Sequence, residues 1–300
     1  MNPRRSILTA LPLAVILIAM AGCSDKNPSG PGGDNVAPTV SSTNPANGAT
    51  GVAVITASMS EAMNASTITT GVKDIAGNAL ASNHVWTFTT SATSSSQLSV
   101  ALGGAGAFAV LAGSTVTSTG ATALTGDLGV SPGSAVTGFP PGTLTGATHA
   151  GDATSATGMA DLTIAYNDAA GRTLGPVTVA GNLGGLTLPP GLYKSTSSLA
   201  ISSGDLTLDA QGDANAVFIF QMASTLTTTA GRAVILSGGA KSTNVYWQVG
   251  TSATLGTTTT FKGTIMADQS ISLNTGATLE GRALARIGAV TLEGNAVVLP

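Results

Sequence analysis

A short repeat near the C-terminal end is the feature that most constrains the fold. Residues Leu255–Gly263 align with Leu273–Gly281 at an offset of 18 residues, and a further step of 19 places Leu292 on Leu273. A unit of this length holds three short strands with their corners, which is one coil of a β-helix whose coils stack about 4.8 Å apart. The repeat therefore predicts a β-solenoid.

The composition favours a mostly β protein with an unusual surface. Hydrophobic residues make up 43% of the chain and charged residues only 8%, whereas a soluble domain carries about 25% charge. The surface must therefore be wetted by Thr, Ser, Asn and Gly. Strand-length apolar runs bounded by turn residues recur along the chain, namely Phe108–Leu111, Val217–Phe220, Val234–Leu236 and Val245–Val249.

One segment, Asp152–Thr173, departs from this β texture. Its apolar residues are spaced three and four apart, as on one face of a helix, and Gly171 ends the pattern. We expect a long helix that packs along one side of the solenoid through Ala156, Met159, Leu162, Tyr166 and Ala169.

The N-terminus predicts export. Residues 1–22 contain Arg4 and Arg5, then an apolar run, then small residues, in the order of a secretory signal. Cys23 follows directly and resembles the lipidated cysteine of a bacterial lipobox; the alternative is an ordinary cleaved signal with an incidental cysteine. Ser24 after the cysteine implies an outer-membrane lipoprotein at the cell surface, held to the membrane through Cys23. Residues 23–36 are expected to form a flexible tether.

Residues 37–90 open with a turn, Asn44-Pro-Ala-Asn-Gly48, and close with a strand around Trp86–Thr90. In both features the segment resembles a bacterial Ig-like domain. A complete Ig sandwich needs about 100 residues, so the segment is predicted to be a shortened, partial β unit that acts as a spacer. Residues 91–97 would link it to the main domain.

Several stretches of residues 98–300, taken in order, carry a family resemblance: Phe108–Ala112, Leu124–Gly133, Leu188–Lys194, Val217–Gln221, Asn244–Val249 and Phe261–Ala267. Together they resemble the microbial ice-binding protein family. This resemblance implies a right-handed β-helix of triangular section with discontinuous coil order, in which N-terminal strands lie among C-terminal coils and one long α-helix packs alongside.

The family resemblance also implies an ice-binding surface. Threonine suits such a surface because its hydroxyl donates and accepts hydrogen bonds and its χ1 angle is stiff. Stacked coils repeat a threonine about every 4.8 Å, which is close to repeats of the ice lattice. The family motif Thr-(Ala/Gly)-X-(Thr/Asn), matched fully or in part, selects Thr119, Thr122, Thr229, Thr257, Thr260, Thr275 and Thr278. In a straight strand the two threonines would point to opposite faces, so the motif must lie beside a corner or bulge.

Other functions receive less support from the sequence. A formal net charge of −3 with no basic patch argues against nucleic-acid binding. A solenoid enzyme acting on polysaccharide would need clustered carboxylates, and Asp205, Asp209 and Asp213 are expected to be loop residues. His149 has no Cys or His partner for a metal. We therefore predict no catalytic residue, no cofactor and no metal, and a monomer; the alternative is a surface adhesin or carbohydrate-binding solenoid.

Overall fold

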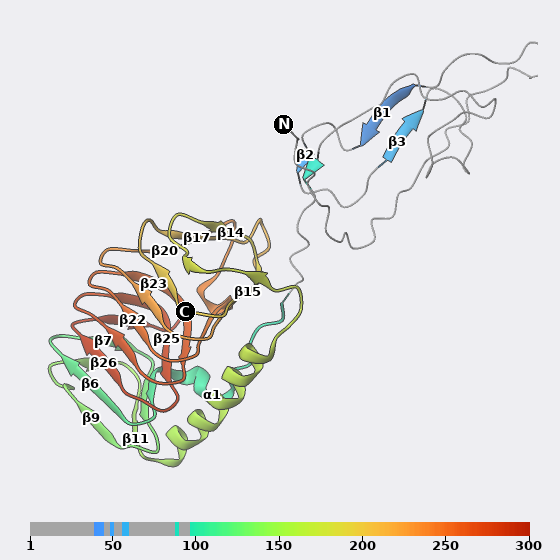
Figure 1. The fold of residues 1–300 in the computed structure, drawn as a ribbon. Helices are drawn as coiled ribbons and strands as arrows, with labels where there is room; N and C mark the ends of the chain where they lie inside the picture. The colour runs from blue at the N-terminus through green and yellow to red at the C-terminus, as the bar shows by residue number, and fades with distance from the viewer. Residues whose placement is uncertain (1–38, 45–48, 51–55, 60–87, 90–96) are drawn as a thin grey trace, which may run out of the picture. The chain divides into compact units, whose positions relative to one another are not determined.

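The computed structural model describes residues 39–44, 49–50, 56–59, 88–89 and 97–300 (Figure 1). The chain divides into two compact units, Met1–Thr93 and Ser94–Pro300. In the first unit, β1 (Val40–Asn44) pairs antiparallel with β3 (Thr56–Met59), and β2 (Ala49–Thr50) pairs parallel with β4 (Phe88–Thr89). The predicted signal, Cys23, Ser24 and the tether lie outside the described residues.

The second unit is a β-helix built from three parallel sheets. The eight-stranded sheet contains, in spatial order, β13 (Gly181–Asn182), β16 (Leu199–Ile201), β19 (Leu226–Thr228), β22 (Ala253–Leu255), β24 (Ile271–Leu273), β26 (Val290–Glu293), β6 (Thr115–Thr119) and β9 (Ala135–Thr137). The three-stranded sheet contains β14 (Thr187–Leu188), β17 (Leu206–Asp209) and β20 (Val234–Ser237).

The twelve-stranded sheet covers more than one side of the solenoid. Its main path runs through β10 (Thr143–Leu144), β7 (Ala123–Thr125), β27 (Ala296–Val298), β25 (Thr278–Ala285), β23 (Thr260–Ala267), β21 (Val245–Val249), β18 (Phe218–Met222), β15 (Gly191–Ser195) and β12 (Val177–Thr178). A branch adds β5 (Phe108–Ala112), β8 (Asp127–Val130) and β11 (Thr148–Ala150). Two short 3-10 helices, η2 (Gly103–Ala107) and η3 (Ser242–Asn244), precede β5 and β21.

The strand register confirms the repeat seen in the sequence. Leu255 pairs with Leu273, and Leu273 pairs with Leu292. Thr260 lies opposite Thr278 in the adjacent strand. Each of the two repeat steps is therefore one coil of the solenoid.

The order in which the coils stack differs from their order along the chain. This discontinuous order is what the family resemblance implied. Strand β26, from the last coil, pairs with β6, from the first, so that Val290 lies opposite Val116. Likewise β25 pairs with β5, and β27 pairs with β7. The coils of residues 108–150 thus stack on the C-terminal coil, where Figure 1 shows green strands beside red ones.

Helix α1 (Ala153–Gly171) packs against the twelve-stranded sheet and connects the two ends of the stack. Asp152 caps its N-terminus by accepting a hydrogen bond from the backbone N–H of Ser155 at 2.8 Å. The predicted packing face is correct for Leu162, Tyr166 and Ala169 but wrong for Ala156, which is exposed. Ser155 and Gly158 are buried in its place. Position 158 requires glycine because a side chain there would meet the ring of Phe108.

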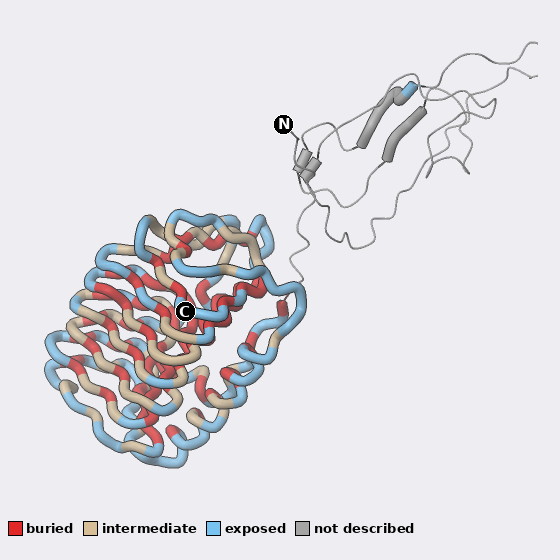
Figure 2. The backbone as a smooth tube through the Cα atoms, in the orientation of Figure 1, coloured by how far each residue is buried: buried red, intermediate tan, exposed pale blue. Residues whose placement is uncertain are grey.

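The interior of the solenoid is apolar, and strand residues alternate between the inside and the outside (Figure 2). Aromatic rings stack along it in successive coils. The ring centroids of Tyr193 and Phe220 are 5.0 Å apart, and those of Phe220 and Trp247 are 4.0 Å apart. Phe261 continues the column at 5.0 Å from Trp247. This rigid filling holds the outer surfaces in fixed positions.

Candidate functional site

The outer side of the eight-stranded sheet is a regular array of small side chains, which we call the hydroxyl face. Most of its strands contribute an inward, an outward and an inward residue in turn. Strand pairing brings the outward residues into one column in register, formed by Asn182, Ala200, Thr227, Thr254, Ser272, Thr291, Thr117 and Thr137. Six successive coils therefore present a hydroxyl at the same position, about 4.8 Å apart.

The hydroxyls of this central column are free to bind an external partner. Within the described part of the chain, none of the six threonine and serine hydroxyls forms a hydrogen bond to another protein group. Their side chains are exposed or partly exposed. Those that are only partly exposed are flanked by their neighbours in the column. Each threonine of the column carries a methyl group beside its hydroxyl, so the column combines small apolar and polar groups.

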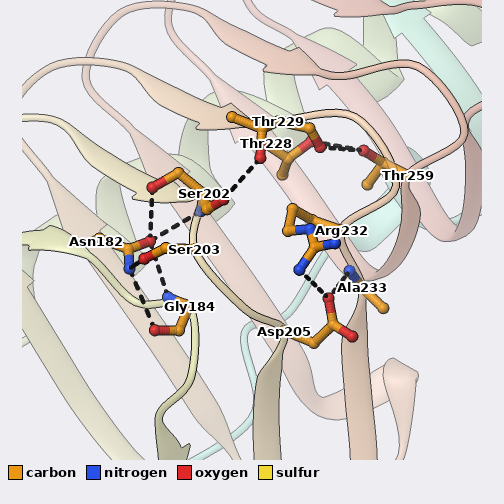
Figure 3. A network of polar contacts seen from close by, with 10 residues as sticks. All are labelled: Asn182, Gly184, Ser202, Ser203, Asp205, Thr228, Thr229, Arg232, Ala233 and Thr259. Atoms are coloured by element: carbon orange, nitrogen blue, oxygen red, sulfur yellow. Dashed lines mark hydrogen bonds and ion pairs between the residues drawn. The ribbon is translucent and has the colours of Figure 1, made fainter.

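Two flanking columns hold neighbouring coils together. On one side, the hydroxyl of Thr225 donates to that of Ser198 at 2.8 Å. On the other, Thr229 donates to the carbonyl of Ser202 at 3.0 Å, as Figure 3 shows. Glu293, at the edge of the face, accepts hydrogen bonds from Thr275. These contacts fix the coil spacing and therefore favour a level surface.

The other two sides of the solenoid differ sharply from the hydroxyl face. The side carrying β21, β18 and the C-terminal half of β25 is covered by α1. The third side, which we call the lysine face, presents Thr207, Ile235, Lys262, Glu280, Val298 and Thr125 in its outward column.

The lysine face is charged and concave. Lys262 donates to the carboxylate of Glu280, and Ser242 donates to the same carboxylate at 2.5 Å. These hydrogen bonds, that from Lys262 first, hold the pKa of Glu280 below its usual value. A hollow of about 430 Å³ lies over these strands and reaches the C-terminal residue, Pro300. A fixed ion pair beside a hollow does not fit a flat, uncharged lattice.

The structure distributes the predicted threonines over several environments. Thr119 and Thr229 lie at the edge of the hydroxyl face, and Thr257 and Thr275 are exposed in the corner beside it. Thr260 and Thr278 are exposed at the start of β23 and β25 on the lysine face.

Thr122 has no access to the surface. Its side chain is 0% exposed, and its hydroxyl accepts a hydrogen bond from Ser118 at 2.7 Å. The tetrapeptides 119–122 and 275–278 are identical, but the first begins one position earlier in its corner than the second, since Thr278 pairs through Ala296 with Ala123. That shift turns Thr122 inward while Thr278 faces outward.

A buried line of polar groups follows the same corner on the inside. Thr228 and Thr259 share a hydrogen bond of 2.8 Å, drawn in Figure 3. Further along, Asn295 donates through its side chain to the carbonyls of Asn274 and Ala277, both at 2.9 Å. The corner is therefore closed by satisfied hydrogen bonds and not by apolar packing alone.

The motif search missed the central column of the hydroxyl face. Its members are embedded in short strands such as Ala253-Thr254-Leu255 and Ile271-Ser272-Leu273. The sequence pattern that could have identified this column is a single threonine or serine between two inward-facing residues, repeated once per coil. The corner motif instead marks residues next to the face.

The acidic residues considered for catalysis have structural partners. Asp205 accepts from the backbone N–H of Ala233 and lies 3.4 Å from Arg232 (Figure 3). Asp209 and Asp213 each accept a backbone N–H two residues further on. Among the described residues, no group of three or more His, Cys, Asp or Glu is placed to hold a metal ion. No described helix combines the length and apolar character needed to cross a membrane.

Comparison with known proteins identifies the class to which this architecture belongs. A model of the Ice-binding-like family matches residues 110–298, and a bacterial Ig-like domain model matches residues 34–70. Because the first match covers more than half of the chain, the protein is a member of the Ice-binding-like family.

Individual relatives agree with this membership. An ice-binding protein of Nostoc sp. (strain HG1) is 47% identical over 138 residues, which are 46% of this chain and 51% of that protein. An ice-binding protein of Flavobacterium frigoris (strain PS1) is 42% identical over 145 residues, 47% of this chain and 51% of that protein. The chain spans about half the length of the curated relatives it matches.

Solved structures share the fold. A crystal structure of an ice binding protein from an Antarctic biological consortium is 60% identical with a TM-score of 0.68, covering 72% of this chain and 96% of that one. The corresponding domain of Shewanella frigidimarina ice-binding protein 1 is 33% identical with a TM-score of 0.64, covering 68% and 98%. The β-helix with one packed helix is thus the architecture of known ice-binding proteins.

Proposed function

We propose that the protein binds ice through the hydroxyl face. The observation that carries this proposal is the column of Thr227, Thr254, Ser272, Thr291, Thr117 and Thr137, in register and without internal hydrogen bonds. Ice offers neither charge nor a pocket-sized ligand, so a binder must present many weak contacts in a level array. The relatives that bear the name ice-binding protein support the same function.

Affinity in this proposal comes from the number of contacts. One hydrogen bond to ice, exchanged for one to liquid water, contributes on the order of 1 kcal/mol. Stiff threonine side chains lose little rotamer freedom on docking, and the packed interior prevents the coils from shifting. Thr119 and Thr229 extend the array at its edge. Thr122 is omitted because it is buried.

Replacing Thr254 with Tyr tests the proposal. Thr254 lies near the middle of the central column, so a bulky ring there would hold several neighbouring hydroxyls off the crystal. We expect the protein concentration that halves ice recrystallisation to rise by at least about tenfold, since several contacts of roughly 1 kcal/mol each are lost. The matched control is Thr125→Tyr on the lysine face, with circular dichroism to verify both folds.

The two variants discriminate between surfaces. Loss of activity in Thr254→Tyr with full activity in Thr125→Tyr supports the proposal. Unchanged ice shaping and recrystallisation by Thr254→Tyr would exclude the hydroxyl face as the binding surface. Retained binding to a polysaccharide but not to ice would favour the adhesin alternative.

We further propose that the domain binds without catalysing a reaction and that it acts as a monomer at the cell surface. The candidate acids serve turns and ion pairs. Cys23, directly after the apolar run, supports a lipid anchor, and Ser24 supports outer-membrane sorting. Metabolic labelling with a palmitate analogue should mark the wild type and not Cys23→Ser, and fractionation should release the variant from the membrane. Light scattering of the unlipidated protein tests the monomer.

A further inference from the structure

In the corner between the hydroxyl face and the lysine face, one threonine has a backbone conformation that glycine adopts in the neighbouring coils. In three successive coils, the corners 229–232, 256–259 and 274–277 each hold four residues between paired positions. The third corner residue has a positive φ in all three: Gly231 at 69°, Thr258 at 57° and Gly276 at 69°. Two of the three are glycine, the residue that adopts this conformation without steric cost.

Backbone hydrogen bonds show that these positions are equivalent. The N–H of Gly231 donates to the carbonyl of Thr257 at 2.9 Å, and the N–H of Thr258 donates to that of Thr275 at 3.0 Å. The ladder continues from Gly276 to Glu293 at 3.1 Å. Thr258 therefore occupies a position whose neighbours above and below are glycines in the same conformation.

A threonine is costly at this position. Branching at Cβ makes the left-handed region a genuine outlier for Thr, and such strain persists mainly where a site needs it. Among the described residues, Gln211 is the only other non-glycine residue with a positive φ, and it lies in a turn between β17 and β18.

No contact within the described part of the chain requires the side chain of Thr258. Its hydroxyl donates to the carbonyl of Thr257 at 2.7 Å, but that carbonyl already accepts the N–H of Gly231. The side chain is exposed, and a Cβ added at Gly231 or Gly276 would come no nearer to it than 3.7 Å. Packing and hydrogen-bond satisfaction would thus be served equally well by glycine.

We propose that Thr258 is an ice-contact residue that extends the hydroxyl face around the corner. Together with Thr257 and Thr275, which are exposed in the same corner, it adds a second line of hydroxyl and methyl groups at an angle to the central column. This proposal rests on the proposed function of the hydroxyl face, and it assigns the backbone strain at Thr258 to ice recognition.

The test compares Thr258→Gly with Gln211→Gly. Both substitutions relieve a positive φ, but only the first removes a side chain from the proposed surface. We expect Thr258→Gly to melt at or above the temperature of the wild type and yet to need a several-fold higher concentration, about fivefold, to inhibit ice recrystallisation. Gln211→Gly should retain the activity of the wild type. Thr258→Ala, which removes the hydroxyl and one methyl but keeps the strained backbone, should weaken ice binding as Thr258→Gly does.

The outcomes separate this inference from the proposed function. Full ice activity in Thr258→Gly, or an equal loss in Gln211→Gly, overturns the role of Thr258. If Thr254→Tyr abolishes ice binding while Thr258→Gly does not, the hydroxyl face stands and only the corner extension fails. If Thr254→Tyr has no effect, the proposed function itself fails.

Discussion

The side chain of Asn295 joins the last coil to the coil before it, and its removal should destabilise the solenoid strongly. Its side chain is 2% exposed. The amide nitrogen donates to the carbonyls of Asn274 and Ala277, and the amide oxygen accepts the backbone N–H of Glu293. Its own backbone N–H donates to the hydroxyl of Thr122 in the first coil at 3.3 Å.

The size of the effect follows from the groups left without partners. Asn295→Ala strands the buried carbonyl of Ala277 and the backbone N–H of Glu293, each at about 1–3 kcal/mol, whereas the carbonyl of Asn274 still accepts the N–H of Ala277. Allowing these two groups to be partly rehydrated, we expect a loss of about 2–4 kcal/mol. For a domain of about 200 residues each kcal/mol shifts the Tm by about 2–4 °C, so the Tm should fall by about 4–16 °C.

Thermal unfolding followed by circular dichroism and calorimetry measures this change. The matched control is Asn215→Ala, an exposed asparagine in a turn, which should alter the free energy of unfolding by less than about 0.5 kcal/mol. Asn295→Asp should also be strongly destabilising, because it sets a carboxylate oxygen against two carbonyls. A loss below about 1 kcal/mol in Asn295→Ala would refute the claim that these hydrogen bonds hold the last coil to the coil before it.

Three further predictions concern the core, the helix and pH. Trp247→Ala removes a fully buried ring from the aromatic column and should cost about 3–5 kcal/mol in the free energy of unfolding, measured with denaturant. Gly158→Ala places a methyl group 2.6 Å from an aromatic carbon of β5; a loss of about 1–3 kcal/mol is expected, and an unchanged melting curve would contradict the close packing of α1. The hydrogen bond from the backbone of Ser155 and then that from His149 lower the pKa of Asp152. The cap therefore stabilises the fold above the ordinary pKa and is lost as pH falls through the lowered one, so Asp152→Asn should flatten the decline in Tm below about pH 4.

The local architecture was accessible from the sequence. The spacing of Leu255, Leu273 and Leu292 predicted the coil because each leucine points inward once per turn. The helix was predicted from its apolar spacing, although Gly158 was not recognised as a packing residue. A glycine in a helix gives no apolar signal, yet here it is what allows the aromatic ring of Phe108 to lie against α1.

The long-range pairing and the facing of individual threonines could not be worked out from the residues. The partner of Val116 is Val290, far along the chain, and no periodicity crosses that gap; only the family resemblance implied it. The facing of Thr122 and Thr278 depends on where each tetrapeptide begins within its corner. A shift of one residue exchanges inside and outside, and the sequence alone does not reveal the shift.

The return path of the chain through α1 has a consequence for how such a molecule can grow. An extra coil inserted between β22 and β24 would add about 4.8 Å to the stack, while the ends of the stack would remain tied together by one helix. At about 1.5 Å per residue, the helix or its connections would have to lengthen by roughly three residues to match. A larger binding surface therefore cannot evolve by duplicating coils alone, because the helix or its connections must lengthen in the same step.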